Sequence, residues 1–239
     1  YANDAYKTAG LSANEYMETV TGFSASLIQS LGGDTEKAAK YADMAITDMS
    51  DNANKMGTDM SSIQNAYQGF AKQNYTMLDN LKLGYGGTKQ EMERLLADAE
   101  KISGVKYDIS SYADVVEAIH VMQESMDIAG TTAKEAEATI SGSVNALKSA
   151  VSNLIVGFGD ADADMELLCN NMVDAFKTVV ANITPVIENI VAALPTALDA
   201  LLTAVGELLP TLLGNASVPA SAAYPGGGVR THDHREHAD

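Results

Sequence analysis

Apolar residues recur at steps of three or four along much of the first 158 residues, which is the spacing of one face of an α-helix. A strand would instead alternate with a period of two. The pattern therefore predicts an all-α fold built from amphipathic helices. Four apolar stripes carry it: Tyr16, Val20, Phe23, Leu27 and Leu31; Tyr41, Ala45, Met49, Ala53 and Met56; Tyr112, Val115, Ile119, Met122 and Met126; and Val144, Leu147, Val151, Leu154 and Phe158.

Glycines and capping motifs divide this region into several helices. Glycine after an apolar stripe supplies the left-handed residue that ends many helices. Ser or Thr with Glu three residues later forms a capping box at a helix start, and Ser12, Thr88 and Thr132 each have that partner. We expect a multi-helix region over residues 1–158, with a connector at 74–88. The segment VKYDIS, residues 105–110, alternates like a strand but is short, so we expect an extended stretch there.

Residues 159–214 differ in being rich in leucine and punctuated by proline. Their apolar steps alternate between four and three, with one extra step of four beside Pro195, which indicates a heptad seam with a stutter. Pro185, Pro195 and Pro210 suit the first turn of a helix better than its interior, so we expect this segment to be kinked or broken into short rods. The expected helix-assembly seam is Phe176, Val180, Ile183, Ile187, Ile190, Leu194, Leu198, Leu201, Val205, Leu208 and Leu212.

The last 25 residues, 215–239, have no apolar period and are rich in small residues, histidine and charge. We expect them to be disordered and unrelated to the fold. The chain starts with Tyr1, so we also expect it to be a piece of a longer protein.

The net charge of the 239-residue chain is −17, which argues against nucleic-acid binding through a basic surface. The chain lacks tryptophan and has four phenylalanines, so its core must consist mainly of aliphatic residues, methionine and alanine. The single cysteine, Cys169, lies on an apolar helical stripe, and we expect a buried, unreactive thiol.

The glycine-rich segment LGYGGTK, residues 83–89, invites comparison with a nucleotide-binding loop. A Walker loop requires lysine followed by Ser or Thr after its last glycine, whereas here Thr88 precedes Lys89. The dinucleotide motif G-x-G-x-x-G also fails, because position 89 is lysine. The spacing instead matches a tight turn followed by a capped helix.

Other candidate sites fail similar tests. The segment DADADM, residues 160–165, lacks the glycine and the glutamate of a calcium loop and fits an acidic helix start. Glu117, His120 and Glu124 share a helix face, but a di-iron bundle needs a second Glu-x-x-His pair, so a surface or partly buried histidine is expected. Three more candidate metal ligands, His232, His234 and His237, lie in the segment expected to be disordered, which offers no preorganised site. No nucleophile motif is present, and the sequence predicts no enzyme, no cofactor and no metal site.

The segment after Ile183 has two interpretations. A narrow leucine seam favours contact with other helices. Membrane contact is the alternative, although Glu188, Asp199 and Glu207 interrupt the apolar stretch and its polar face has no Lys or Arg.

Residues 10–104 closely resemble the tail tape measure proteins of long-tailed bacteriophages and prophages. The resemblance is most specific over NAYQGFAKQNYTMLDNLKLGYGGTKQEMERLL, residues 65–96, and continues through TTAKEAEATISGSVNALKSAVSNL, residues 131–154, to about residue 214. It does not include residues 215–239.

The resemblance implies a mostly helical structural protein, present in several copies in the lumen of the tail tube, whose length sets the length of the tail. It implies self-association, contact with tail tube and tail tip proteins, and assembly chaperones in the bacterial host cytoplasm. It also implies a role in genome ejection, in which apolar parts reach the host membrane. Some members of the family carry cell-wall hydrolase domains, and nothing in this sequence supplies one.

Overall fold

The computed structural model describes residues 1–214, with side chains to residue 208. The predicted disordered segment, 215–239, lies outside the described residues. Over residues 1–214 the chain is all-α, as predicted, and contains no strand. It divides into two units, residues 1–187 and 188–239. The elements are α1 (Ala5–Thr8), α2 (Ala13–Thr21), α3 (Ser24–Ser30), α4 (Thr35–Met56), α5 (Met60–Phe70), the 3-10 helix η1 (Leu78–Leu81), α6 (Lys89–Ser103), α7 (Tyr112–Ser125), α8 (Thr131–Ala138), α9 (Ile140–Gly157) and α10 (Met165–Gly214).

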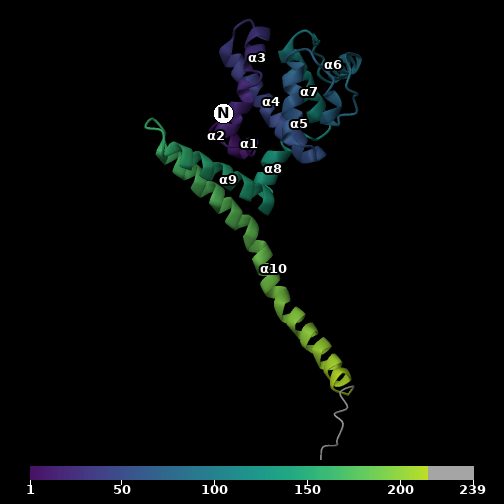
Figure 1. Cartoon of the computed structure of the whole chain (residues 1–239), viewed down its shortest axis with the longest axis vertical. Helices are drawn as coiled ribbons and strands as arrows, with labels where there is room; N and C mark the ends of the chain where they lie inside the picture. The colour runs from purple at the N-terminus through teal and green to yellow at the C-terminus, as the bar shows by residue number, and fades with distance from the viewer. Residues whose placement is uncertain (215–239) are drawn as a thin grey trace, which may run out of the picture. The chain divides into compact units, whose positions relative to one another are not determined.

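Helix α4 is the centre of the first unit, and α2, α3, α5, α7, α8 and η1 all pack against it (Figure 1). The first three predicted stripes face this core, where Leu27, Met49 and Ile119 are fully buried. Helix α6 packs mainly on α7 and adds Met92 and Leu95 to the same apolar cluster. The 22 residues of α4 thus bring together segments that are far apart in the sequence.

Two of the three expected helix starts are observed. Ser12 forms a complete capping box with Glu15 at α2, and the Thr88 side chain caps α6 by accepting from the Glu91 N–H. The third expectation, at Thr132, is wrong. Helix α8 begins one residue earlier, at Thr131, and its N-cap is Gly130 without a side-chain cap. Its first N–H groups are bonded instead by a side chain of α4, which sequence spacing could not reveal.

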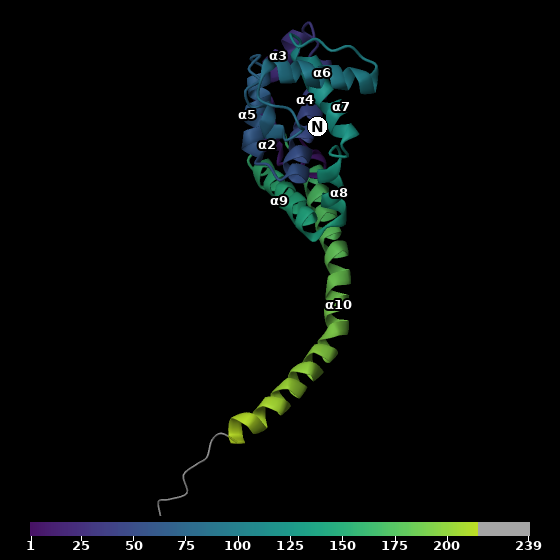
Figure 2. The ribbon, with the colours of Figure 1, turned by 90° about the vertical axis from the view of Figure 1, so that its right-hand side faces the viewer.

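Helices α1, α8, α9 and the first turns of α10 form a second layer of this unit (Figure 2). The predicted stripe of α9 faces it only in part: Leu147 packs against the cluster, whereas Phe158 is 75% exposed and Val144, Val151 and Leu154 are only partly buried. The helix approaches too closely for large residues, because a Cβ at Gly142 would overlap the backbone of Glu135. The buried face consists of Ser143, Ala146, Ser149, Ala150, Asn153 and Gly157.

The polar members of this face tie α9 to the start of α2. Ser149 Oγ donates to the Gly10 carbonyl at 3.0 Å, and Asn153 Oδ1 accepts from the Ala13 N–H at 2.7 Å. Because Ala13 is the first residue of α2, Asn153 satisfies a backbone donor that has no partner within that helix. Hydrogen bonding therefore selects small polar residues where the stripe predicted large apolar ones.

Helix α10 is a single element of 50 residues, so the expectation of separate short rods is wrong. Pro185, Pro195 and Pro210 lie inside it rather than at helix starts. Each proline removes the N–H that would bond the carbonyl four residues earlier. Residues 184–208 are all exposed, so water can satisfy the carbonyls of Ala181 and Val191, and the helix continues at the cost of local bending.

Cys169 is exposed, contrary to the expectation of a buried thiol. The buried positions at the start of α10 are Leu168, Asn171, Ala175 and Val179. Since successive residues point about 100° apart around a helix, Cys169 lies beside this stripe rather than on it.

Candidate assembly surface

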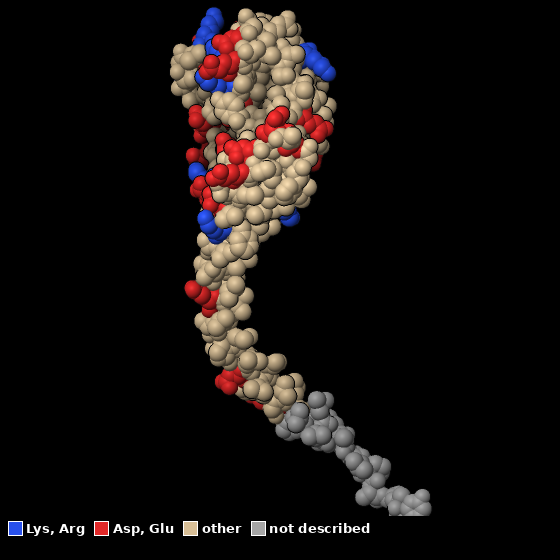
Figure 3. Space-filling view, turned by 90° about the vertical axis from the view of Figure 1, so that its left-hand side faces the viewer, with Lys and Arg blue, Asp and Glu red and all other residues tan. Residues whose placement is uncertain are grey.

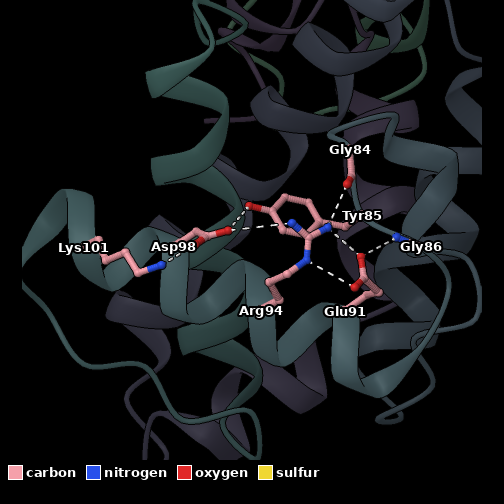
Figure 4. Close-up of polar contacts among 7 residues, drawn as sticks. All are labelled: Gly84, Tyr85, Gly86, Glu91, Arg94, Asp98 and Lys101. Atoms are coloured by element: carbon pink, nitrogen blue, oxygen red, sulfur yellow. Dashed lines mark hydrogen bonds and ion pairs between the residues drawn. The ribbon is translucent and has the colours of Figure 1, made fainter.

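The glycine-rich turn before α6 has its polar groups satisfied within the protein (Figure 4). Glu91 Oε2 accepts from the Gly86 N–H at 3.0 Å, and the Thr88 N–H donates to the Gly86 carbonyl at 2.9 Å. Gly84 adopts a positive φ of 85°, and a Cβ at Gly87 would overlap the Thr76 carbonyl. The glycines are therefore explained by backbone geometry, and the N–H groups of Gly86 and Thr88 already have hydrogen-bond acceptors within the protein.

Arg94 fastens this turn to α6. Its guanidinium donates to the Gly84 carbonyl at 2.9 Å and to Glu91 at 2.6 Å, and it lies over the Tyr85 ring, 4.2 Å from the ring centroid. The Tyr85 hydroxyl donates to Asp98 Oδ2 at 2.9 Å, and Lys101 pairs with the other oxygen of Asp98 at 2.8 Å (Figure 4). This network holds the turn in place. It supports the interpretation, made from residue spacing, that the segment is a tight turn before a capped helix.

His120 is partly buried, as expected, but its main partner lies on another helix. Its Nδ1 lies 2.9 Å from Oδ1 of Asp48 on α4, a residue that is only 1% exposed. Its Nε2 is 3.5 Å from Glu124, whereas Glu117 accepts from the Tyr41 hydroxyl at 2.6 Å. The predicted helix-face trio therefore does not converge on one point, and no group of three metal-binding side chains occurs among residues 1–214.

The sequence analysis missed the buried polar run of α4. Asp51 is fully buried, and its two oxygens accept from the N–H groups of Gly130 (2.6 Å) and Thr132 (2.8 Å) at the start of α8. Asn52 is also fully buried and donates to the Leu81 carbonyl at 2.9 Å. The sequence signal was the polar segment DMSDNAN, residues 48–54, inside an otherwise apolar-periodic helix. These residues join α4 to α7, α8 and η1, which is a structural role.

Stability of the first unit should fall as pH rises from 5.5 to 8. Burial raises the pKa of Asp48 to about 6, and the hydrogen bond with Asp48 raises the pKa of His120. The negative charges of Glu124 and Glu117 also raise the pKa of His120, and those of Asp51 and Glu124 raise the pKa of Asp48. Both raised values mean that the folded state binds more protons than the unfolded state, so the free energy of unfolding decreases as these protons are lost.

Urea unfolding of the full chain at pH 5.5 and pH 8 measures this dependence. Asp48→Asn should flatten it, because this substitution removes one titrating group and also the hydrogen bond that raises the pKa of His120. A variant with the wild-type pH dependence would show that the Asp48–His120 pair does not cause it.

The segment at 160–165 is an acidic helix start, as predicted. Asp164 accepts from the Leu167 N–H at 2.9 Å, which satisfies one of the first backbone donors of α10. Asp160 accepts from the Asp162 N–H at 3.0 Å in the preceding turn. These hydrogen bonds give the carboxylates a structural role.

The apolar seam of α10 is the largest surface feature that packing within the chain leaves unexplained. In the first unit Phe176, Val180 and Ile187 are between 45% and 56% exposed, and Ile183 is partly buried. In the second unit every described side chain of residues 188–208 is exposed. Leu212 lies beyond the described side chains. The seam members of the second unit, from 45% to 60% exposed, are Ile190, Leu194, Leu198, Leu201, Val205 and Leu208.

Charge on this part of the helix is sparse and of one sign. Between Lys177 and Arg230 the chain has Glu188, Asp199 and Glu207 but no Lys or Arg. In Figure 3 the second unit accordingly shows acidic atoms among uncharged ones on the face drawn. This surface therefore has a large apolar area, and its charged groups are all acidic.

Residues 165–208 of α10 are long and apolar enough to cross a membrane by length and composition, with a mean hydropathy of 1.5 in the best window, of which no part is buried. This stretch contains five acidic residues, and any of their carboxylates that lay in the hydrocarbon would be costly. The apolar face therefore has two candidate environments, other helices and a lipid bilayer.

Comparison with known proteins gives no relative. The chain matches no protein family model, no curated protein and no solved structure.

Proposed function

We propose that this chain is a segment of a phage tail tape measure protein, a structural component that sets tail length and scaffolds tube polymerisation inside the tail lumen. The observation that carries the proposal is α10, a 50-residue helix whose residues 184–208 are all exposed and include most of its apolar seam. At about 1.5 Å per residue such a helix spans about 75 Å. A long helix with an uncovered face suits a ruler assembled from several chains.

Three further points support a structural role. The sequence resembles tape measure proteins over most of residues 10–214. The glycine-rich turn, the segment 160–165 and His120 all have hydrogen-bond partners that explain them structurally. Among the residues whose side chains the structure describes, the longest run of exposed apolar residues lies on α10. The expected partners are other copies of the chain, tail tube and tail tip proteins, and assembly chaperones in the host cytoplasm before the chain enters the virion.

In-frame deletion of residues 188–209 in the phage that carries this chain tests the proposal. The deletion removes 22 residues and should shorten the tail by about 33 Å if the segment lies extended as helix. Tail length is measured by electron microscopy. Unchanged length among intact tails would contradict a ruler function for this segment.

A membrane-active module for genome ejection is the second candidate, favoured by the apolar length of α10. It predicts that the full chain releases dye from lipid vesicles and that Leu198→Glu abolishes the release. Absence of leakage from both neutral and anionic vesicles would remove this candidate.

A further inference from the structure

The apolar face of α10 repeats every 11 residues. Four rows of positions share this spacing, and every position is Phe, Leu, Ile or Val. The rows are Phe176, Ile187, Leu198 and Leu209; Val179, Ile190, Leu201 and Leu212; Val180, Val191, Leu202 and Leu213; and Ile183, Leu194 and Val205. The extra step of four beside Pro195 is therefore part of a regular pattern rather than an interruption.

An 11-residue repeat has a structural consequence that a heptad does not have. Eleven residues in three turns give about 3.67 residues per turn, slightly more than the 3.6 of an α-helix. Helices that keep such a face in contact wind around one another in a right-handed supercoil, whereas heptads give a left-handed one.

We propose that α10 binds further copies of itself, parallel and in register, through this 11-residue face, forming a right-handed bundle. The proposal rests on the proposed function, in which several copies lie together, and specifies how they meet.

The charges of α10 favour another copy over a lipid surface or a basic partner. Glu188 and Asp199 each follow a member of the first row, and Glu207 lies two residues before Leu209, so each is displaced by roughly 100° or more from that row. The three carboxylates then point away from the contact in every copy, which avoids repulsion between identical chains. Helices that lie on membranes usually carry Lys or Arg on their polar face, and residues 178–214 contain neither.

The exposed area is sufficient for a specific contact. Seven members of the rows between Ile190 and Val205 are 45–69% exposed. They offer roughly 600–800 Å² per chain, comparable with the about 800 Å² per partner that a standard interface buries.

The prolines favour a parallel, in-register arrangement. Pro185 lies on the side of the helix opposite Ile187, whereas Pro195 lies seven residues before Leu202 and therefore at the edge of the apolar face. Proline bends a helix away from itself, because its ring displaces the carbonyl of the preceding turn. Helices bent at given levels pack along their whole length only against partners bent at the same levels, which parallel copies in register provide.

Matched pairs of substitutions at exposed positions test the 11-residue face. Val191 and Leu202 belong to it but lie outside the heptad seam, whereas Leu208 belongs to the heptad seam but lies outside the 11-residue rows. Val186 is a second apolar residue outside the rows. Sedimentation equilibrium of the full chain measures the dissociation constant, and circular dichroism verifies that the helices remain folded.

The double variant Val191→Gln/Leu202→Gln should raise the dissociation constant at least tenfold, since losing about 1.4 kcal/mol at the contact has this effect. The control Val186→Gln/Leu208→Gln should change it less than threefold. A larger increase in the dissociation constant for the control pair would favour the heptad seam as the contact surface and overturn the proposal. A wild-type chain that stays monomeric would also overturn it, while the tail-length test of the proposed function would be unaffected.

Discussion

Asp51→Ala is expected to lower the free energy of unfolding of the first unit by about 3 kcal/mol, one of the largest effects of any single substitution in the chain. The carboxylate is fully buried in α4 and accepts from the first N–H groups of α8, at Gly130 and Thr132. Each of these donors would lose its partner, and an unsatisfied buried donor costs about 1–3 kcal/mol. Urea unfolding followed by circular dichroism measures the change.

Asp34 provides the matched control. It caps α4 by accepting from the Lys37 N–H at 2.9 Å, but it is exposed. Asp34→Ala should cost about 1 kcal/mol, as is typical for an N-cap. Equal effects of the two substitutions would show that Asp51 acts as an ordinary cap and does not hold α8 against α4.

The second large effect is covalent. In a Cys169→Ser background, Leu198→Cys should form disulfides between chains almost completely under mild oxidation. Parallel copies in register bring the two Leu198 positions to the same level of the apolar face, within reach of the 4.4–6.8 Å Cα separation that disulfides usually require. Thr196→Cys should form few, because this position points outward. The products are separated by non-reducing gel electrophoresis.

Cross-linking that is stronger at Thr196 than at Leu198 would contradict the parallel arrangement. Both positions are exposed in the second unit, so neither substitution removes packing within the chain. A difference between them therefore reports the contact between chains.

Local signals in the sequence predicted most of the fold. Apolar spacing identified the all-α class and the core faces containing Leu27, Met49 and Ile119, because an amphipathic helix buries the stripe that its own sequence defines. The Ser12 and Thr88 caps were also found, since capping partners lie within three residues. The structural role of the glycine-rich turn was also predicted correctly, because the residues that form it are close together in the sequence.

Contacts between distant segments could not be predicted in this way. Thr132 was predicted to be a helix cap. Instead, its backbone N–H donates to Asp51, which lies 81 residues earlier in the sequence. The stripe on α9 looked like a core face, but the close approach at Gly142 selects small residues. Asp48 lies on α4 and finds His120 on α7, 72 residues away. Each outcome depends on which helices meet, and helical spacing does not contain that information.

The candidate surface was predicted in part. The seam residues of α10 were identified from their spacing, whereas the exposed residues Val191 and Leu202 were not, because they lie outside the heptad positions of that seam. The prolines were expected in the first turns of new helices, but an exposed helix can satisfy the freed carbonyls with water and continue through them. The apolar spacing therefore located the surface. The exposure of residues 184–208 showed that packing within the chain does not cover this part of it.

Tail length after duplication of residues 188–209 tests the central claim most directly, because an added segment cannot lengthen a tail merely by damaging the protein. The duplication preserves the 11-residue phase, since Leu209 is followed by Glu188 as Ile187 is. Electron microscopy of the phage that carries this chain should show tails longer by about 33 Å. Intact, infectious particles with tails of unchanged length would contradict the account.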